Sequence, residues 1–90
     1  MAKVRIPAPL RNLTRQQAVV DAVGKTVEEV VADLEKSYPG FRERICDETG
    51  QIRRFINIFV DGEDVRLKNG IKCPVGVTAE LSIIPAIAGG

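Results

Sequence analysis

Polar and apolar residues alternate at the start of the chain, which is the pattern of β-strands. In residues 3–7, Val4 and Ile6 fall on one face and the charged residues between them on the other, because successive side chains of a strand point to opposite sides. A loop over residues 8–15 precedes a β-branched run at residues 17–23, which favours a second strand. The two strands are expected to pair as a long hairpin.

A helix is predicted after the hairpin. Thr26-Val27-Glu28-Glu29 forms a capping box, in which the Thr26 hydroxyl accepts from the Glu29 N–H and the Glu29 side chain reaches back to Thr26. Beyond it, apolar residues recur at helical spacing and form one stripe: Val27, Val30, Val31, Leu34 and Tyr38. Pro39-Gly40 ends the helix. Residues 41–47 are expected to add a helical turn with Phe41 and Ile45 under the main helix.

The second half of the chain is predicted to form further strands. Residues 53–60 are the strongest strand pattern in the chain and are expected to be central in the sheet. Asp61-Gly62 is typical of a type I′ turn, which leads to a returning arm at Glu63 to Arg66. An irregular stretch over residues 67–77 precedes the last strand, residues 79–84.

This pattern indicates one α+β domain in which a mixed sheet packs on one main helix. The order is ββαββ, with minor helical turns. We expect residues 1–85 to form the domain and residues 86–90 to form a flexible Gly-Gly tail, because nothing after Pro85 fits a strand.

Composition and charge exclude several classes of protein. The chain has 90 residues, of which 44% are hydrophobic and 28% charged, with a net charge of +1. Basic and acidic residues are interleaved, so no footprint for nucleic acid or an anionic membrane is predicted. No apolar run approaches the roughly 20 residues of a membrane span, and the first residues lack the long apolar stretch that is typical of a signal peptide. We expect a cytoplasmic protein with Cys46 and Cys73 reduced.

Residues for independent catalysis are missing. The chain has no His, and it lacks a Gly-rich phosphate loop, a nucleophile elbow and a cysteine pattern for metal. Its paired carboxylates fit a helix first turn and a hairpin tip better than an acid/base pair. Cys46 and Cys73 are interpreted as small covered thiols, with a persulfide relay as the alternative. The chain is therefore not expected to be an enzyme, nor to bind a metal or cofactor.

The tail carries the functional hypothesis. Ala86-Ile87-Ala88-Gly89-Gly90 follows the last strand, and five extended residues reach roughly 17 Å. Gly89 and Gly90 have no side chains, so a narrow channel of a partner enzyme can close around them, with Ala88 and Ile87 behind. The carboxylate of Gly90 is left unhindered, as an activating enzyme requires.

A docking surface is predicted beside the tail. If Ile56 and Ile58 point inward, the two-residue period turns Phe59 outward, and the same alternation turns Ile84 outward. Phe59 and Ile84 then form an exposed apolar patch that suits a protein interface; the alternative is that a loop covers them. Four arginines, Arg5, Arg53, Arg54 and Arg66, either rim this patch or form a solvated face.

The sequence resembles the ThiS/MoaD ubiquitin-like sulfur carriers over nearly its whole length. The resemblance is carried by the segment Leu10 to Thr14, by the strand and turn from Asn57 to Gly62, and by the ending Ile84 to Gly90. It implies a ubiquitin-like β-grasp fold. It also implies that an activating-type partner uses ATP to adenylate the Gly90 carboxylate, which then becomes a thiocarboxylate.

Within this family the chain is most similar to carriers that deliver sulfur for cysteine synthesis. Residues 54–60, the segment 63–66 after them and the ending Pro-Ala-Ile-Ala-Gly-Gly carry this resemblance. It implies two further partners: a PLP-dependent cysteine synthase that accepts the sulfur, and a JAMM-type metalloprotease that releases the product. ATP and PLP belong to these partner enzymes.

Three alternatives remain open at this point. A molybdopterin synthase small subunit uses the same thiocarboxylate but stays bound to a large subunit. A ubiquitin-like modifier joins Gly90 to lysines of other proteins. A ubiquitin-like interaction module uses no chemistry at its terminal glycines.

Overall fold

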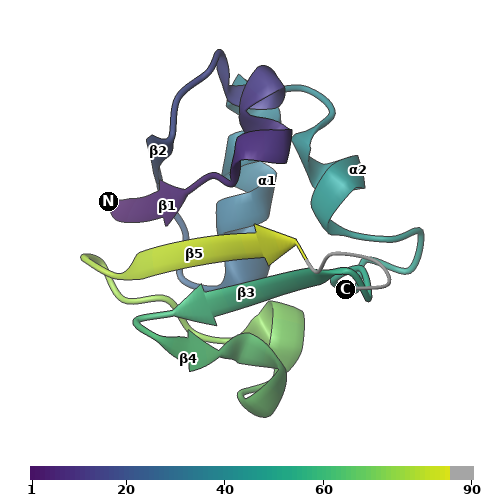
Figure 1. Ribbon diagram of the computed structural model, residues 1–90. Coiled ribbons are helices and arrows are strands. Elements are labelled where there is room, and N and C mark those ends of the chain that lie inside the picture. Colours follow the sequence, from purple (N-terminus) through teal and green to yellow (C-terminus); the bar gives the residue numbers. More distant parts are fainter. Residues whose placement is uncertain (86–90) are drawn as a thin grey trace.

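A single mixed sheet with the strand order β2-β1-β5-β3-β4 organises the chain (Figure 1). The computed structural model describes residues 1–85, so the predicted tail at 86–90 lies outside the described residues. The helices and strands are β1 (Ala2–Arg5), β2 (Val19–Ala22), α1 (Val27–Ser37), α2 (Phe41–Ile45), β3 (Ile56–Val60), β4 (Glu63–Asp64) and β5 (Glu80–Pro85).

The last strand takes the middle of the sheet. β5 pairs in parallel with β1 and antiparallel with β3, and β2 and β4 form the two edges. The expectation that residues 53–60 form the central strand is therefore wrong by one position, because β3 lies between β5 and the short β4. The apolar pattern of residues 53–60 indicates a buried strand. An inner strand such as β3 has this pattern as well as the middle strand does.

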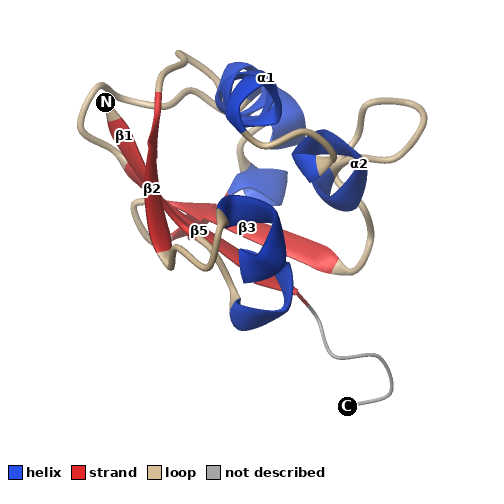
Figure 2. Ribbon diagram, turned by 90° about the horizontal axis from the view of Figure 1, so that it is seen from above, coloured by secondary structure: helices blue, strands red, loops and turns tan. Residues whose placement is uncertain are grey.

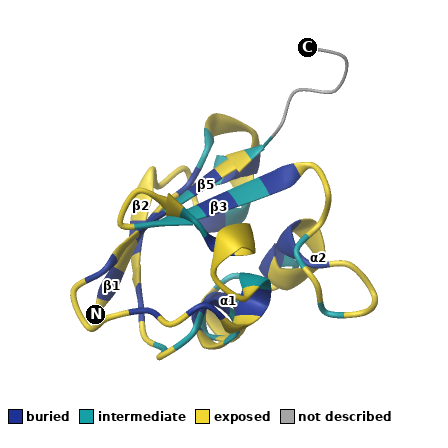
Figure 3. Ribbon diagram, turned by 90° about the horizontal axis from the view of Figure 1, so that it is seen from below, coloured by how far each residue is buried: buried dark blue, intermediate teal, exposed yellow. Residues whose placement is uncertain are grey.

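The core lies between the sheet and the helices, which cover one face (Figure 2). All four helix positions that point inward are fully covered, namely Val27, Val30, Val31 and Leu34. Along β3 and β5, buried residues alternate with half-buried or exposed ones (Figure 3). The strand alternation and four members of the predicted stripe are confirmed, whereas the fifth member, Tyr38, follows the end of α1 and is only partly buried. The arrangement is the expected β-grasp.

The start of α1 follows the predicted cap in one of its two bonds. Thr26 Oγ1 accepts from the Glu29 N–H at 3.2 Å. The carboxylate of Glu29 does not return to Thr26 but accepts from the N–H of Lys25 at 2.9 Å. The extended loop before the helix presents the donor of Lys25 to this carboxylate, so the cap closes one residue earlier than predicted.

A carboxylate of α1 also fixes α2. Glu35 accepts from the N–H groups of Gly40 at 3.1 Å and Arg42 at 2.8 Å. Both bonds lower the pKa of Glu35, and the bond from the Arg42 N–H has the larger effect. Phe41 and Ile45 are fully buried, which confirms the predicted turn under the main helix.

Two segments differ locally from the sequence prediction. The expected loop after β1 is a 3₁₀ helix, Ala8–Thr14, with Leu10 and Thr14 buried. The Asp61-Gly62 turn has φ of 50° and 87°, as type I′ requires, but the returning arm is a strand for only two residues. Asp64 accepts from the Arg66 N–H at 2.9 Å and begins a 3₁₀ helix, Val65–Leu67.

The loop between β2 and α1 yields a stability prediction at Gly24. A Cβ there would lie 2.7 Å from the Val30 nitrogen and 2.9 Å from the carbonyl carbon of Glu29. Because both are helix backbone, Gly24→Ala is expected to lower the free energy of unfolding by about 1–3 kcal/mol. Denaturant unfolding measures the loss.

The matched control is Gly76→Ala. A Cβ at Gly76 meets nothing within 4 Å, so the unfolding free energy is expected to stay within about 0.5 kcal/mol of wild type. Equal losses at both glycines would contradict the close approach of the loop to α1.

Candidate functional site

The candidate site lies on the face of the sheet that the helices do not cover, where the start of β3 pairs with the end of β5 at Pro85. Asn57 lies opposite Ile84, Phe59 lies opposite Ser82, and Ile56 lies opposite Pro85. We call Asn57, Phe59, Ser82 and Ile84 the outer patch. It adjoins the residue from which the tail begins.

The faces of both strands are as predicted. Ile56, Ile58, Leu81 and Ile83 are buried, and Val60 packs partly against them. On the opposite face, Ile84 is 49% exposed and Phe59 is half-buried. Both predicted docking residues therefore point away from the core, while their role in docking stays a prediction.

Phe55 is an exposed aromatic that the predicted patch did not include. It precedes β3 and is 58% exposed, more than Ile84. Its neighbour Ile56 pairs with Pro85, which places Phe55 near the start of the tail. The alternation of residues 53–60 predicted that Phe55 points outward. In the structure Phe55 lies in the turn before β3, and this position leaves its side chain exposed.

A shallow depression continues the apolar surface on the other side of β5. It has a volume of about 340 Å³ between the β1–β2 hairpin and the end of β5. Its lining includes Arg5, Arg11, Val19, Ile84 and Pro85. On the β1 side, apolar side chains at the end of β5 are thus flanked by arginines.

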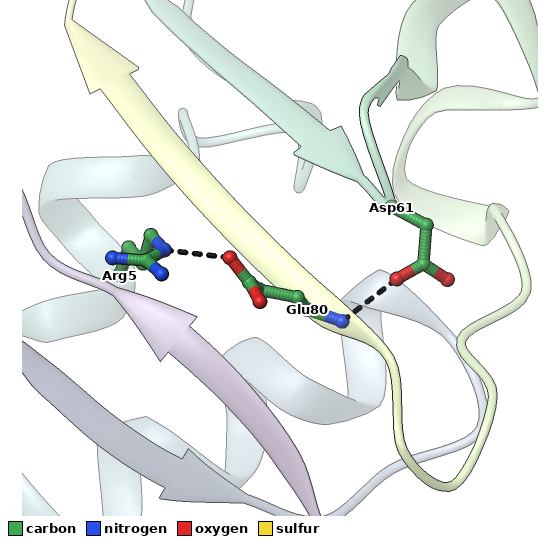
Figure 4. A network of polar contacts seen from close by, with 3 residues as sticks. All are labelled: Arg5, Asp61 and Glu80. Atoms are coloured by element: carbon green, nitrogen blue, oxygen red, sulfur yellow. Dashed lines mark hydrogen bonds and ion pairs between the residues drawn. The ribbon is translucent and has the colours of Figure 1, made fainter.

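A polar network fixes the opposite end of β5 (Figure 4). Arg5 on β1 donates to the Glu80 carboxylate at 2.6 Å, and Asp61 in the β3–β4 turn accepts from the Glu80 N–H at 3.0 Å. The ion pair is more than half exposed on the arginine side, so its contribution to stability is at most about 1 kcal/mol. Together the contacts link the start of β5 to both of its neighbours.

The four arginines proposed as a rim have different environments. Arg5 pairs with Glu80, and Arg53 donates to the Glu43 carbonyl at 2.7 Å. Arg66 bonds to the segment that begins β3. Within residues 1–85, Arg54 makes no side-chain hydrogen bond or ion pair. The structure therefore does not bring them together as one rim.

The two thiols are covered. Cys46 and Cys73 are free and only 5% and 3% exposed. Burial raises the pKa of each thiol above its ordinary value, which keeps it protonated and weakly nucleophilic at neutral pH. This environment does not favour the persulfide relay.

The remaining predicted site residues fall in the tail. Gly90, Gly89, Ala88 and Ile87 lie outside the described residues. Within residues 1–85, no cluster of His, Cys, Asp or Glu side chains is arranged to hold a metal ion. No helix in that part of the chain is long and apolar enough to cross a membrane.

Comparison with known proteins gives consistent matches over the whole chain. The ThiS family model matches residues 4–90. Sulfur carrier protein CysO of Mycobacterium tuberculosis is 42% identical over 89 residues, which cover 97% of this chain and 96% of the relative.

Solved structures agree in fold. CysO in a crystal structure of the Amycolatopsis orientalis BexX/CysO complex has a TM-score of 0.95 and 39% identity, with 100% of both chains covered. The small archaeal modifier protein 1 of Methanosarcina acetivorans has a TM-score of 0.82 and 26% identity, with 99% of this chain and 95% of that one covered.

The adjacent residues Ile83 and Ile84 test the assignment of faces. Ile83 is 4% exposed and Ile84 is 49% exposed. Ile83→Ala is expected to lower the unfolding free energy by about 2–5 kcal/mol, whereas Ile84→Ala loses less than about 1 kcal/mol. Chemical denaturation of both variants makes the comparison, and the reverse ranking would show that the faces are exchanged.

Proposed function

This chain belongs to the ThiS family, and we propose that it is a sulfur carrier protein whose working group is the carboxylate of Gly90. The observation that carries the proposal is that the family match extends through residue 90 and so includes the terminal Gly-Gly. The position of Pro85 supports it, because the central strand ends there beside an uncovered apolar patch. The chain then acts as a co-substrate of partner enzymes.

The proposed chemistry has two steps, both on the carboxyl group of Gly90. The Gly90 carboxylate attacks the α-phosphate of ATP on an activating enzyme, pyrophosphate leaves, and an acyl adenylate forms. Sulfide then attacks the carbonyl carbon, and AMP leaves with one of the carboxylate oxygens. The product is a thiocarboxylate, in which one oxygen of Gly90 is replaced by sulfur.

The chain supplies geometry to these steps. Gly89 and Gly90 present no Cβ to the walls of an active-site channel, and Ala86, Ile87 and Ala88 link them to Pro85. The outer patch provides the docking area, and it adjoins Pro85, the residue from which the tail begins. Catalytic groups and the nucleotide belong to the partner.

The acceptor that we propose is a cysteine-forming synthase. The likeness to CysO proteins over nearly the full length supports this branch, and a PLP-dependent synthase would accept sulfur from the thiocarboxylate. A JAMM-type metalloprotease would then release cysteine from the carrier. A crystal structure in which CysO is in complex with BexX supports the general point that such carriers dock on other proteins. Because this activation would require ATP, the cytoplasm is the location that we propose.

Protein modification is the second candidate. The likeness to small archaeal modifier protein 1 favours it, because a modifier would use the same adenylated Gly90 but pass it to a lysine amine. Branched peptides that carry Gly90 on a lysine would identify this function. A molybdopterin synthase subunit would instead co-purify with its large subunit, and an interaction module would keep full function without its tail.

Thiocarboxylation of the chain is the first prediction from this proposal. With its activating enzyme, ATP and sulfide, the protein is expected to gain the mass of one oxygen-to-sulfur exchange, located at Gly90 by fragmentation. Deletion of Gly89 and Gly90 should abolish the exchange. Gly89→Val should impair it, because a branched side chain enters the closed channel.

Intact folding of the variants is the control, measured by denaturant unfolding. The core lies within residues 1–85, so both tail variants should unfold as the wild type does. Sulfur on Cys46 or Cys73, or thiocarboxylation of the truncated chain, would overturn the assignment to Gly90.

Docking gives a separate prediction. Phe59→Ala and Ile84→Ala should each raise the Kd for the activating enzyme by at least tenfold, since anchors of protein interfaces cost roughly 2 kcal/mol or more when truncated. Val77→Ala is the matched control, because Val77 is 79% exposed and precedes the opposite end of β5. Calorimetric titration measures the Kd of the three variants for the activating enzyme. An equal rise in Kd for Val77→Ala would contradict a specific docking patch.

A further inference from the structure

The outer edge of β3 is only partly covered by a strand. β4 pairs with β3 through Phe59–Asp64 and Val60–Glu63 alone. Val60 faces Glu63, so by the two-residue period the backbone carbonyl of Ile56 points to the same edge, beyond the end of β4. Within residues 1–85 no strand lies beside Ile56 on that side.

The guanidinium of Arg66 occupies this position. Its Nη2 donates to the carbonyls of Ile56 at 2.7 Å and Arg53 at 2.8 Å, and its Nη1 donates to the side-chain oxygen of Asn57 at 2.8 Å. One planar fork thus joins three acceptors at the start of β3. Such multidentate geometry suits arginine and not lysine, whose ammonium is a single point charge.

The local fold aims Arg66 at these acceptors. Asp64 accepts from the Arg66 N–H and ends β4 after two residues. Val65 is fully buried and anchors the 3₁₀ helix to the core. Arg66 therefore projects from a 3₁₀ turn that is held by the Asp64 hydrogen bond and by buried Val65. Because β4 ends early, the edge of β3 at Ile56 is open to the Arg66 side chain.

The segment that Arg66 binds, the start of β3, pairs with the end of β5 from which the tail begins. Ile56 pairs with Pro85, and Asn57 pairs with Ile84. If the start of β3 were loosened, Ile84 and Pro85 would have no strand partner, because the pairing of β5 with β1 stops at Ser82. Pro85 and Ile84 thus depend on β3, and the start of β3 is bonded to Arg66.

We propose that Arg66 is a positioning residue for partner docking: its guanidinium fixes the β3–β5 pairing at Ile84 and Pro85, and thereby the outer patch and the residue from which the tail begins. This inference rests on the proposed function of Gly90. Arg66 has no direct part in the chemistry. Its effect passes through the backbone of β3.

Arg66→Gln and Arg66→Lys test the proposal, with Arg54→Gln as the control for loss of a nearby positive charge. Both Arg66 variants are expected to lower kcat/KM for thiocarboxylation by about tenfold, because a loosened β3–β5 pairing displaces Asn57 and Ile84 of the outer patch, which is proposed to dock on the activating enzyme. Arg54→Gln should stay within about twofold of wild type, in line with its lack of side-chain bonds within residues 1–85.

Amide hydrogen exchange supplies a readout that does not depend on activity. In both Arg66 variants, exchange at Asn57 and Ile84 should accelerate at least tenfold relative to Val4 and Val20, which pair in the β1–β2 hairpin away from this segment. A uniform acceleration across the sheet would instead indicate general destabilisation and would overturn the positioning role.

The two proposals fail in different ways. If Arg66→Lys keeps the wild-type kcat/KM while Arg66→Gln loses it, Arg66 acts as a charge toward the partner, and the positioning role is wrong. If the exchange at Asn57 and Ile84 is unchanged, it is also wrong. If the wild-type chain itself gains no sulfur, the proposed function fails, and the exchange data still decide what Arg66 holds.

Discussion

The pairing of β5 between β1 and β3 is the constraint on which the rest of the structure depends. Both edges of β5 are hydrogen-bonded, one in parallel and one antiparallel. Because side chains alternate between faces, a shift of one residue would turn Ile84 into the core and Leu81 and Ile83 out of it. The register of this strand therefore decides which residues form the core, which form the outer patch, and where Pro85 lies.

Polar contacts at both ends of β5 add to its pairing with β1 and β3. Arg5 and Asp61 bind the start of the strand through Glu80. At the other end, Arg66 holds the segment of β3 that pairs with Ile84 and Pro85. Phe59 and Ile84 are left on an uncovered face, which is the condition for a partner to bury them.

The thiols complement this arrangement in a protein proposed to react through one carboxylate. Cys46 and Cys73 are buried, and their raised pKa values keep them protonated. A persulfide donor or an acyl adenylate therefore meets little competing nucleophile on the carrier itself. The fold separates its own sulfur atoms from the sulfur that it is proposed to carry.

Local patterns in the sequence determined the elements and their faces. The alternation in residues 53–60 and 79–84 identified the outward side chains, the Asp61-Gly62 pair identified a type I′ turn, and Thr26 identified the start of α1. These features depend on the backbone period and on bonds between near neighbours, which a single sequence records. The tail hypothesis at Gly90 also came from sequence, since it needs only a terminal residue without a side chain.

Contacts between distant segments were decided only by the tertiary structure. The sequence did not reveal that β5 is the middle strand, since an apolar run has the same pattern in any covered position. It left Arg66 as one of four surface arginines, because its three acceptors lie 9 to 13 residues away and are brought together by the early end of β4. Period and composition describe each segment alone, whereas strand order and the reach of a side chain depend on which segments the folded chain places side by side.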